Sequence, residues 1–496
     1  MRFLFIDIDS QRPDHLGCYG YHRDTSPNID RIADRGIRFN RAYVSDSPCV
    51  PGRASMFGGM FGVHNGISTH WGPGSQYRLD GDIYRDRAGE ITHTLARTLY
   101  DAGYYTVSVS SFADRHAAFW HTSGFREYHS HTLKRGNETA DEVNEAALPI
   151  LKRIAKQDDW FLHVNYWDPH RNYRVPQEWL DRYSDDPPPE WPDQDAIDSQ
   201  QDLSGPFTAP ELFPYRPPVS PGNSPIPPGP GGDPFPEKIE TVSDWNRWID
   251  GYDGSVAFTD YHFGQLLEVL EEQGVLEETC IIITADHGEH QGEMGIYGDH
   301  TSGYEASHHV PLIISPPDGV EVVESDELVY TLDIAPTICE MAGIDSQAGW
   351  DGQSLVRTIK GRANDPGRDH LVLTHGLYSC QRSVRTHKWL FTRTYHPGLF
   401  DYPAVSLYDM ELDKYQTKNL AELMPDIVKD LDSRLSGWLH EQLGRPGNEG
   451  DPLLEVIRTG PWKYVRHEEW IRHLQESGRS DAAARIQNRL SAWPGN

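Results

Sequence analysis

The sequence has few cysteines, and no stretch of it is uniformly apolar over any great length. Its five cysteines, at positions 18, 49, 280, 339 and 380, form no Cys-x-x-Cys pair. Such a set excludes a disulfide framework and a zinc finger, and it predicts mostly buried thiols. No window approaches the roughly 18 apolar residues that a membrane-spanning helix needs. The apolar run at residues 3–6 is too short for a secretory signal, so we expect a cytoplasmic protein that binds no membrane.

Positive charge is also scarce. The chain has 45 Lys and Arg residues against 75 Asp and Glu residues, and its formal net charge is −30. A field of this sign repels nucleic acid and anionic lipid, so we expect neither as a partner. An anionic substrate would therefore need a local positive site made of arginine, lysine or a metal ion.

The order of apolar segments predicts the fold class. Short apolar runs typical of buried strands alternate with amphipathic segments typical of helices. This alternation predicts an α/β fold with a large, mostly parallel sheet sandwiched by helices. From about residue 370, short alternating strands precede helices expected over residues 425–443 and 468–491. We therefore expect a large domain over residues 1–370 and, over residues 371–496, a smaller C-terminal subdomain with an antiparallel sheet and helices.

A proline-rich insertion interrupts the large domain at residues 184–236. Its many prolines and glycines and its few aliphatic residues predict an extended, irregular segment. Such a segment could equally be a flexible surface excursion or an ordered lid or oligomer contact. The sequence thus leaves the formation of a homo-oligomer open.

Polar side chains follow three of the predicted strands. Asp9 ends the first of them, Asp168 and His170 follow another, and Asp286 and His287 follow a third. In open parallel sheets, ligands bind beyond the carboxyl ends of the strands. We therefore expect these acidic and imidazole groups to meet at one site.

The sharpest local pattern is Cys49, Pro51 and Arg53, in the spacing Cys-x-Pro-x-Arg ahead of a helical stretch. Proline suits the first turn of a helix, where free N–H groups and the helix dipole favour an anion. Arg53, one turn further along, can reach back toward the same point. The pattern would also suit a buried cysteine beside a capped helix, so the motif alone is not decisive.

This motif stands within an ordered series of further matches, through which the chain resembles the type I, formylglycine-dependent sulfatases of the alkaline phosphatase superfamily. In that family, Cys-x-Pro-x-Arg marks the cysteine that a formylglycine-generating enzyme oxidises. The resemblance implies that residue 49, as an aldehyde hydrate, attacks sulfur with one hydroxyl and expels sulfate with the other. It also makes residues 1–370 the catalytic domain. The matching segments are residues 9, 16–20, 26–30, 49–53, 94–96, 102–104, 168–170, 284–289, 292–293, 310–314, 407–411 and 419–421.

The resemblance further implies one divalent cation, held by Asp9, Cys49, Asp286 and His287. Hard oxygen donors suit Ca²⁺ or Mg²⁺, and an imidazole among them allows Mn²⁺ or Zn²⁺ as well. We expect Ca²⁺. Many sulfatases carry two adjacent aspartates at the first position, whereas here a serine follows Asp9. Asp7, one layer deeper in the strand, is a weaker substitute for the missing carboxylate.

By the same resemblance, Cys49, Arg53, His170 and His300 are the catalytic candidates. Either histidine could contact the sulfate or protonate the leaving oxygen, which needs a well-placed acid. The candidate substrate contacts are His70, Arg115 and His116.

Two lysines that the family usually carries are missing, one near Ser111 and one at Asp299. Arg115 and His116 are candidate replacements for the first. The two losses predict less positive charge around the sulfate and a distinct group of substrates. The candidates for a wall that stacks on a sugar or binds a carboxylate are Trp167, Arg171 and Arg174.

These features predict a sulfatase that hydrolyses a small organic sulfate monoester, either a sulfated sugar or an alkyl or aryl sulfate. The net charge disfavours long polyanions by repulsion. The alternative is a phosphodiesterase or phosphonate monoester hydrolase of the same superfamily, and the missing lysines favour sulfate because phosphoryl groups demand more positive charge. A catalytically idle relative is the third hypothesis, and retention of the whole set of candidate residues argues against it.

Overall fold

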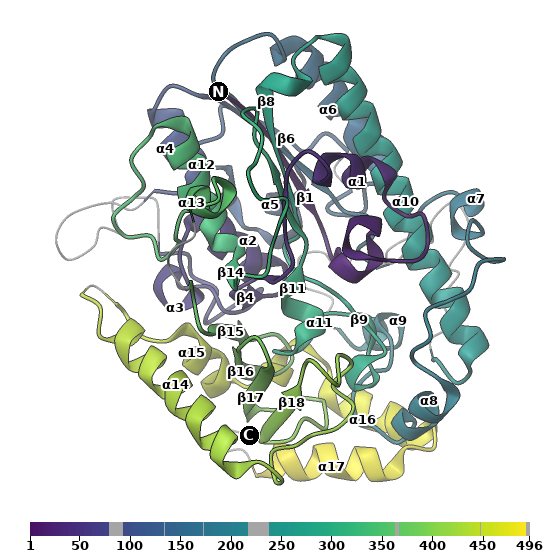
Figure 1. Ribbon diagram of the computed structural model, residues 1–496. Coiled ribbons are helices and arrows are strands. Elements are labelled where there is room, and N and C mark those ends of the chain that lie inside the picture. Colours follow the sequence, from purple (N-terminus) through teal and green to yellow (C-terminus); the bar gives the residue numbers. More distant parts are fainter. Residues whose placement is uncertain are drawn as a thin grey trace.

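The computed structural model describes residues 1–78, 93–132, 134–171, 173–216, 238–362, 367–446 and 448–492. A central eight-stranded sheet organises the larger part of the chain (Figure 1). The strand β12 runs antiparallel to both of its neighbours, and the other neighbouring pairs are parallel, as the sequence predicts. In spatial order the strands are β13 (Glu324–Ser325), β2 (Ile37–Phe39), β12 (Leu312–Ser315), β8 (Thr279–Thr284), β1 (Arg2–Ile8), β7 (Trp160–Tyr166), β5 (Tyr105–Val109) and β6 (Glu127–His129).

Helices cover both faces of this sheet, because side chains alternate along each buried strand. Leu4, Ile6 and Ile8 of β1 pack in one core with α1 (Pro27–Ala33), α6 (Ala140–Ile154) and the long α10 (Val242–Glu272). Phe3 and Phe5 face the other core, with α2 (Cys49–Gly58), α4 (Leu95–Asp101) and α12 (Ile334–Ala342). Figure 1 shows α10 on one side of the sheet and α12 with α4 on the other. The expected sandwich of helices around a sheet is confirmed.

A second sheet lies in the C-terminal part, at the bottom of Figure 1. Its strands, in order, are β18 (Val405–Asp409), β17 (Trp389–His396), β16 (Cys380–Arg385), β15 (Leu371–His375) and β4 (Asp46–Ser47). The first four are antiparallel and β4 is parallel to β15. Leu431 and Leu435 of α14 (Pro425–Leu443) pack on its apolar face. The predicted antiparallel sheet with helices is confirmed. The domain boundary at residue 370 stays a prediction, and β4, which precedes that boundary in the sequence, joins the C-terminal sheet.

Two local expectations are wrong. The helix expected over residues 468–491 is divided into α16 (His467–Glu476) and α17 (Ser480–Ser491), because Gly478 adopts a left-handed φ of 85° between them. The insertion is not irregular throughout: α8 (Gln194–Gln200), α9 (Ala209–Leu212) and a 3₁₀ turn at Phe213–Tyr215 form within it. Leu212 joins the same core as Trp470 of α16. Residues 217–236 of the insertion lie outside the described residues.

The cysteines at 49, 280, 339 and 380 are buried and the one at 18 is half-buried, all as free thiols, which confirms the expectation. Within the described ranges, no helix combines the length and the apolar character that crossing a membrane requires. The remaining strands and α-helices are β3 (Ala42–Tyr43), β9 (His290–Gln291), β10 (Tyr297–Asp299), β11 (His309–Val310), β14 (Val329–Tyr330), α3 (Gly62–Asn65), α5 (Phe112–His116), α7 (Gln177–Leu180), α11 (Glu305–His308), α13 (Val356–Ile359) and α15 (Pro452–Thr459).

Candidate active site

Two neighbouring strands, β1 and β8, bring three of the candidate metal ligands, Asp9, Asp286 and His287, to one edge of the sheet, and β7 lies beside β1. The amide of Asp9 donates to the carbonyl of Tyr166 at 2.9 Å, and the amide of Ser10 donates to Asp286 Oδ1 at 3.3 Å. These bonds align the ends of the strands. One buried group of four side chains has possible metal-ligand atoms that all lie within 4.8 Å of one another. Its members are Asp9, Cys49, Asp286 and His287.

Cys49 reaches this group because α2 begins at it and approaches the neighbouring loop closely. A Cβ added at Gly52 would lie 2.2 Å from the carbonyl oxygen of Asp286, so this close approach requires glycine. The sulfur of Cys49 lies 3.0 Å from His287 Nε2. Just before the helix, the Ser47 hydroxyl lies 2.8 Å from His375 Nδ1. The C-terminal sheet therefore helps to position the segment that carries the candidate nucleophile.

Arg53 lies beneath the group, among its carboxylates. Its Nε donates to Asp7 Oδ2 at 2.7 Å and its Nη1 to Asp9 Oδ2 at 3.1 Å, and Nη1 also binds Asp286. The guanidinium is fully buried and stacks over the ring of Phe112 at 4.9 Å. Arg53 therefore offsets one of the three carboxylate charges and does not line the cavity above them, so its catalytic role stays a prediction.

The buried charges fit a divalent cation. The carboxylates of Asp7, Asp9 and Asp286 surround the single guanidinium of Arg53, which leaves two negative charges unbalanced. Burial raises the pKa of Asp286 well above its ordinary value; Arg53 opposes this, and Asp9 and Asp7 reinforce it. Carboxylate oxygens with one imidazole are donors that Ca²⁺, Mg²⁺ or Mn²⁺ accept. Asp7 is outside the close group of donor atoms, because Arg53 holds it one layer deeper.

A cavity opens above Cys49. It brings together the candidate nucleophile, both candidate catalytic histidines and all three predicted substrate contacts. The ring of His300 lies 4.1 Å from that of His287 and 5.8 Å from that of His170, measured between centroids. The lining residues are Cys49, His70, Trp71, Arg115, His116, His170, Arg171, Arg216, His300, Leu377 and Tyr378.

Three arginines line this cavity and supply positive charge there, although the two family lysines are missing. Arg115 and Arg171 come from candidate positions in the sequence, whereas Arg216 comes from the insertion and no motif pointed to it. Asp299, which stands where the family usually has lysine, is paired with Arg171 Nη1 at 2.6 Å. Arg216 Nη2 lies 4.0 Å from the same carboxylate oxygen.

Burial disfavours the protonated form of the two candidate catalytic histidines of the cavity, His170 and His300. Burial lowers the pKa of His170 well below its ordinary value, and the charges of Arg115 and Arg171 lower it further. Burial lowers the pKa of His300 in the same way. Either ring can gain a proton only when an anion enters the cavity and offsets the arginine charges.

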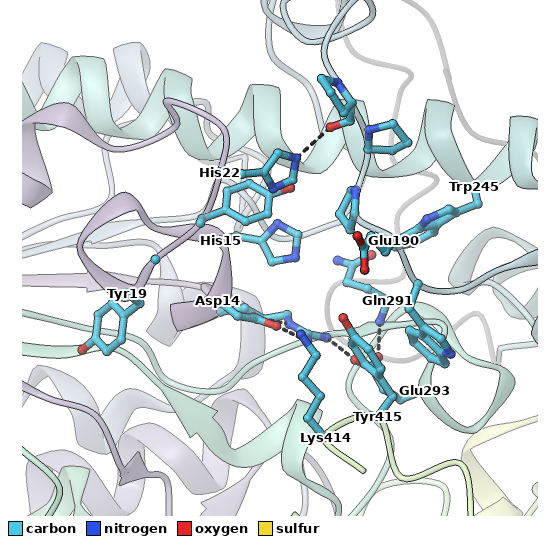
Figure 2. A pocket seen from close by; sticks show the side chains of 17 residues that line it. Asp14, His15, Tyr19, His22, Glu190, Trp245, Gln291, Glu293, Lys414 and Tyr415 are labelled. Carbon is cyan, nitrogen blue, oxygen red and sulfur yellow. Dashed lines mark hydrogen bonds and ion pairs between the residues drawn. The ribbon is translucent and has the colours of Figure 1, made fainter. Parts of the chain in front are cut away.

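A wider cavity of about 510 Å³ lies elsewhere on the surface. Figure 2 shows acidic and aromatic side chains in its wall, including Asp14, Glu190, Trp245, Glu293 and Tyr415. None of the candidate metal ligands or catalytic residues lines it. Its larger size therefore does not identify it as the reaction site, because the candidate residues line the smaller cavity at Cys49.

Two family models match the chain. A family model described as Sulfatase matches residues 2–344, and one described as N-sulphoglucosamine sulphohydrolase, C-terminal, matches residues 292–441. The chain is 25% identical over 443 residues to the uncharacterized sulfatase YidJ of Escherichia coli (strain K12), across 85% of this chain and 83% of that protein.

Two solved structures share the fold. One is of a protein in complex with its substrate D-glucosamine-2-N,6-O-disulfate, with a TM-score of 0.71 at 19% identity over 90% of this chain and 99% of that chain. The other is the phosphonate monoester hydrolase of Agrobacterium radiobacter, with a TM-score of 0.69 at 20% identity over 89% of this chain and 96% of that chain.

Proposed function

The chain belongs to the sulfatase family, and on that premise we propose that it hydrolyses an organic sulfate monoester at the cavity above Cys49. One observation carries the proposal: the sulfur of Cys49 lies in the close group with Asp9, Asp286 and His287 and also lines a cavity walled by arginine and histidine. A nucleophile between a cation site and a positive cavity is suited to a tetrahedral anion.

Each side chain has a proposed task. A divalent cation, which we propose to be Ca²⁺, would be held by Asp9, Asp286, His287 and residue 49, and it would neutralise charge on the sulfate oxygens. Formylglycine made from Cys49 would supply the attacking hydroxyl. Arg53 keeps the carboxylates of the group in place by its ion pairs.

The other residues of the cavity would hold the substrate. Arg115 faces the cavity, and its guanidinium donates to the carbonyl of Arg135 at 3.0 Å, which fixes its direction. We assign the sulfate oxygens to Arg115, with His70 and His116 beside it. His170 and His300 would donate to the leaving oxygen, once the bound anion has raised their proton affinity.

Among sulfate esters we favour a sulfated sugar. The solved structure with D-glucosamine-2-N,6-O-disulfate has the same fold, and the cavity has the polar donors that hydroxyl groups require. Phosphonate monoester hydrolysis is the second candidate. Three arginines in the cavity supply the positive charge that a phosphoryl group demands, and a phosphonate monoester hydrolase also has this fold.

The nucleophile can be tested by peptide mass spectrometry of active protein produced together with a formylglycine-generating enzyme. We expect formylglycine at residue 49 and activity in proportion to its occupancy. Cys49→Ser should lose turnover, because it lacks the second hydroxyl that expels sulfate. Active protein that carries only unmodified thiol at residue 49 would overturn the assignment.

A further inference from the structure

Two of the cavity arginines form a distinct group away from the metal-ligand cluster. Arg171 follows β7, and Arg216 ends the described part of the insertion. Both guanidiniums lie over the ring of Phe213, at 4.9 Å and 4.8 Å, and that of Arg216 also lies 5.5 Å from the ring centroid of Tyr378. We call Arg171 and Arg216 the arginine pair. Segments distant in the sequence thus hold two cations against the same cavity as Cys49.

The charges around the arginine pair do not balance. Asp299 is the carboxylate that both approach, at 2.6 Å from Arg171 and 4.0 Å from Arg216, so two positive charges share one negative charge. Arg115 adds a third positive charge, and in the described part of the chain no carboxylate lies within ion-pair distance of it. A sulfate monoester carries a single negative charge. Once it has balanced Arg115, one positive charge remains at the arginine pair.

Hydrogen-bond donors of the arginine pair are also left over. The side chains of Arg171 and Arg216 are 5% and 11% exposed. The Nε atom of each is buried and has no hydrogen-bond partner among the described residues. A buried donor without a partner costs free energy that an oxygen of a ligand would recover. A single arginine would suffice to neutralise Asp299, so a purely structural role leaves the second guanidinium and these donors unexplained.

His300 links the nucleophile to the arginine pair through its contacts. Its ring nitrogen belongs to a close group with Cys49 and His287, and its backbone amide donates to Asp299 Oδ1 at 2.9 Å. Asp299 in turn holds Arg171. An anion at the arginine pair would therefore lie across His300 from the sulfate that faces Cys49, as a second substituent of the same substrate would.

We propose that the arginine pair binds a second anionic group of the substrate, a carboxylate or a second sulfate, next to the sulfate ester that is cleaved. The inference rests on the proposed sulfatase function and specifies its substrate class as doubly anionic sugars. The planar fork of a guanidinium donates two parallel hydrogen bonds to either kind of oxyanion. Asp299 orients Arg171. Its single negative charge reduces the free-energy cost of burying the arginine pair without cancelling the charge of both guanidiniums.

Three sulfated sugars with the same scissile sulfate test the proposal: one otherwise neutral, one with a carboxylate and one with a second sulfate. The measured quantity is the ratio of kcat/KM for each doubly anionic sugar to kcat/KM for the neutral one. We expect at least one ratio to be well above 1 in the unaltered enzyme, and the larger of the two identifies the anion. Arg216→Gln and Arg171→Gln should lower that ratio about ten- to hundredfold, the loss of one charge-assisted hydrogen bond.

Arg182→Gln is the matched control, because it removes the same charge at an exposed residue of the segment after β7 that does not line the cavity. It should leave the ratio unchanged. If Arg171→Gln fails to fold, Arg216→Gln alone decides, since that side chain is nearer the surface. Equal ratios for all sugars in the unaltered enzyme, or equal losses in the arginine variants and the control, would overturn the proposal.

A binding measurement separates this inference from the proposed function. Metal-loaded Cys49→Ala protein, which cannot turn over, is titrated calorimetrically with the same sugars, with and without Arg216→Gln. If a doubly anionic sugar binds more tightly than the neutral one and Arg216→Gln abolishes this difference, the proposed role of the arginine pair is supported. This holds even if the enzyme never releases sulfate. Equal affinity for all three sugars contradicts it even if the enzyme is an active sulfatase.

Discussion

At the scale of single residues, Arg53 explains how three carboxylates coexist in a buried site. It binds Asp7 from one side and Asp9 and Asp286 from the other. Asp7 is also 3.5 Å from His163 Nε2, one layer below the cavity. Asp9 and Asp286 instead face His287, at 3.6 Å and 3.4 Å. The carboxylates therefore divide into one that supports Arg53 and two that can reach a cation.

This division predicts different metal contents for two matched variants. Asp286→Asn should lose most of its bound divalent cation, because it removes a charged oxygen of the close donor group. Asp7→Asn should keep the cation but melt at a lower temperature, since weakening a buried ion pair costs about 3 kcal/mol or more. Elemental analysis and thermal unfolding of both variants are the measurements. Loss of the metal from Asp7→Asn as well would make Asp7 a ligand.

The sequence identified most of the site at this scale because its residues stand at strand ends or in one motif. Asp9, Asp286 and His287 follow predicted strands, and parallel strands bring their carboxyl ends together. Arg216 and Tyr378 could not be found in this way. Each lies in a loop without a recognisable motif, and only the folded insertion and the second sheet bring them to Cys49.

At the scale of elements, the close contact between α2 and the loop after β8 builds the site. Gly52 allows it, because its missing Cβ leaves room for the carbonyl of Asp286. A backbone carbonyl cannot rotate aside as a long side chain can. The spacing between helix and loop therefore sets the distance between residue 49 and the other candidate ligands.

Gly52→Ala should push α2 away and lower stability, cation affinity and activity together. Overpacking of this kind typically costs about 1–3 kcal/mol of stability. The higher helix propensity of alanine offsets a small part of this cost. Gly437→Ala in α14 is the control, because nothing lies within 4 Å of the added methyl group. It should stabilise the protein by about 0.5–1 kcal/mol. Urea unfolding of both variants decides, and a Gly52→Ala protein with unaltered midpoint and cation affinity would contradict the role of this contact.

The elements themselves were predictable where apolar periodicity is strong. The strands β1, β7 and β8 end shortly before Asp9, Asp168 and Asp286, as the sequence indicates. The break at Gly478 was missed because a single glycine is tolerated inside a helical pattern, and its left-handed φ depends on packing. The short helices α8 and α9 were missed because tertiary contacts, such as those of Leu212, stabilise them.

At the scale of the whole molecule, two electrostatic effects oppose each other as the pH falls. The net charge of −30 becomes smaller in magnitude, which relieves repulsion and favours the folded state. Buried histidines act in the other direction. Burial lowers the pKa of His290 and His308 to about 4 and that of His375 to about 3, whereas unfolded histidine titrates near 6.5.

The buried histidines should decide the outcome. Between pH 6.5 and about 4 these histidines bind protons in the unfolded chain and not in the folded chain, so they lower stability as the pH falls. Buried carboxyl groups such as Asp168 and Asp260, whose pKa burial raises to about 7, act in the opposite direction but are fewer than the buried histidines with a lowered pKa. Each such histidine contributes a slope of about 1.4 kcal/mol per pH unit inside that window. Thermal unfolding in the presence of a chelator, at low and high salt, is the measurement. Stability that rises on acidification at low salt and is flat at high salt would mean that net repulsion dominates.

The most direct test of the account compares a sulfate monoester with a phosphonate monoester that share the p-nitrophenyl leaving group. The protein should carry confirmed formylglycine at residue 49 and saturating divalent metal, with Cys49→Ala as the control. We predict a higher kcat/KM for the sulfate and loss of both activities in Cys49→Ala. A faster phosphonate reaction, or sulfate release that survives Cys49→Ala, would contradict the assignment of this chain as a sulfatase that acts through residue 49.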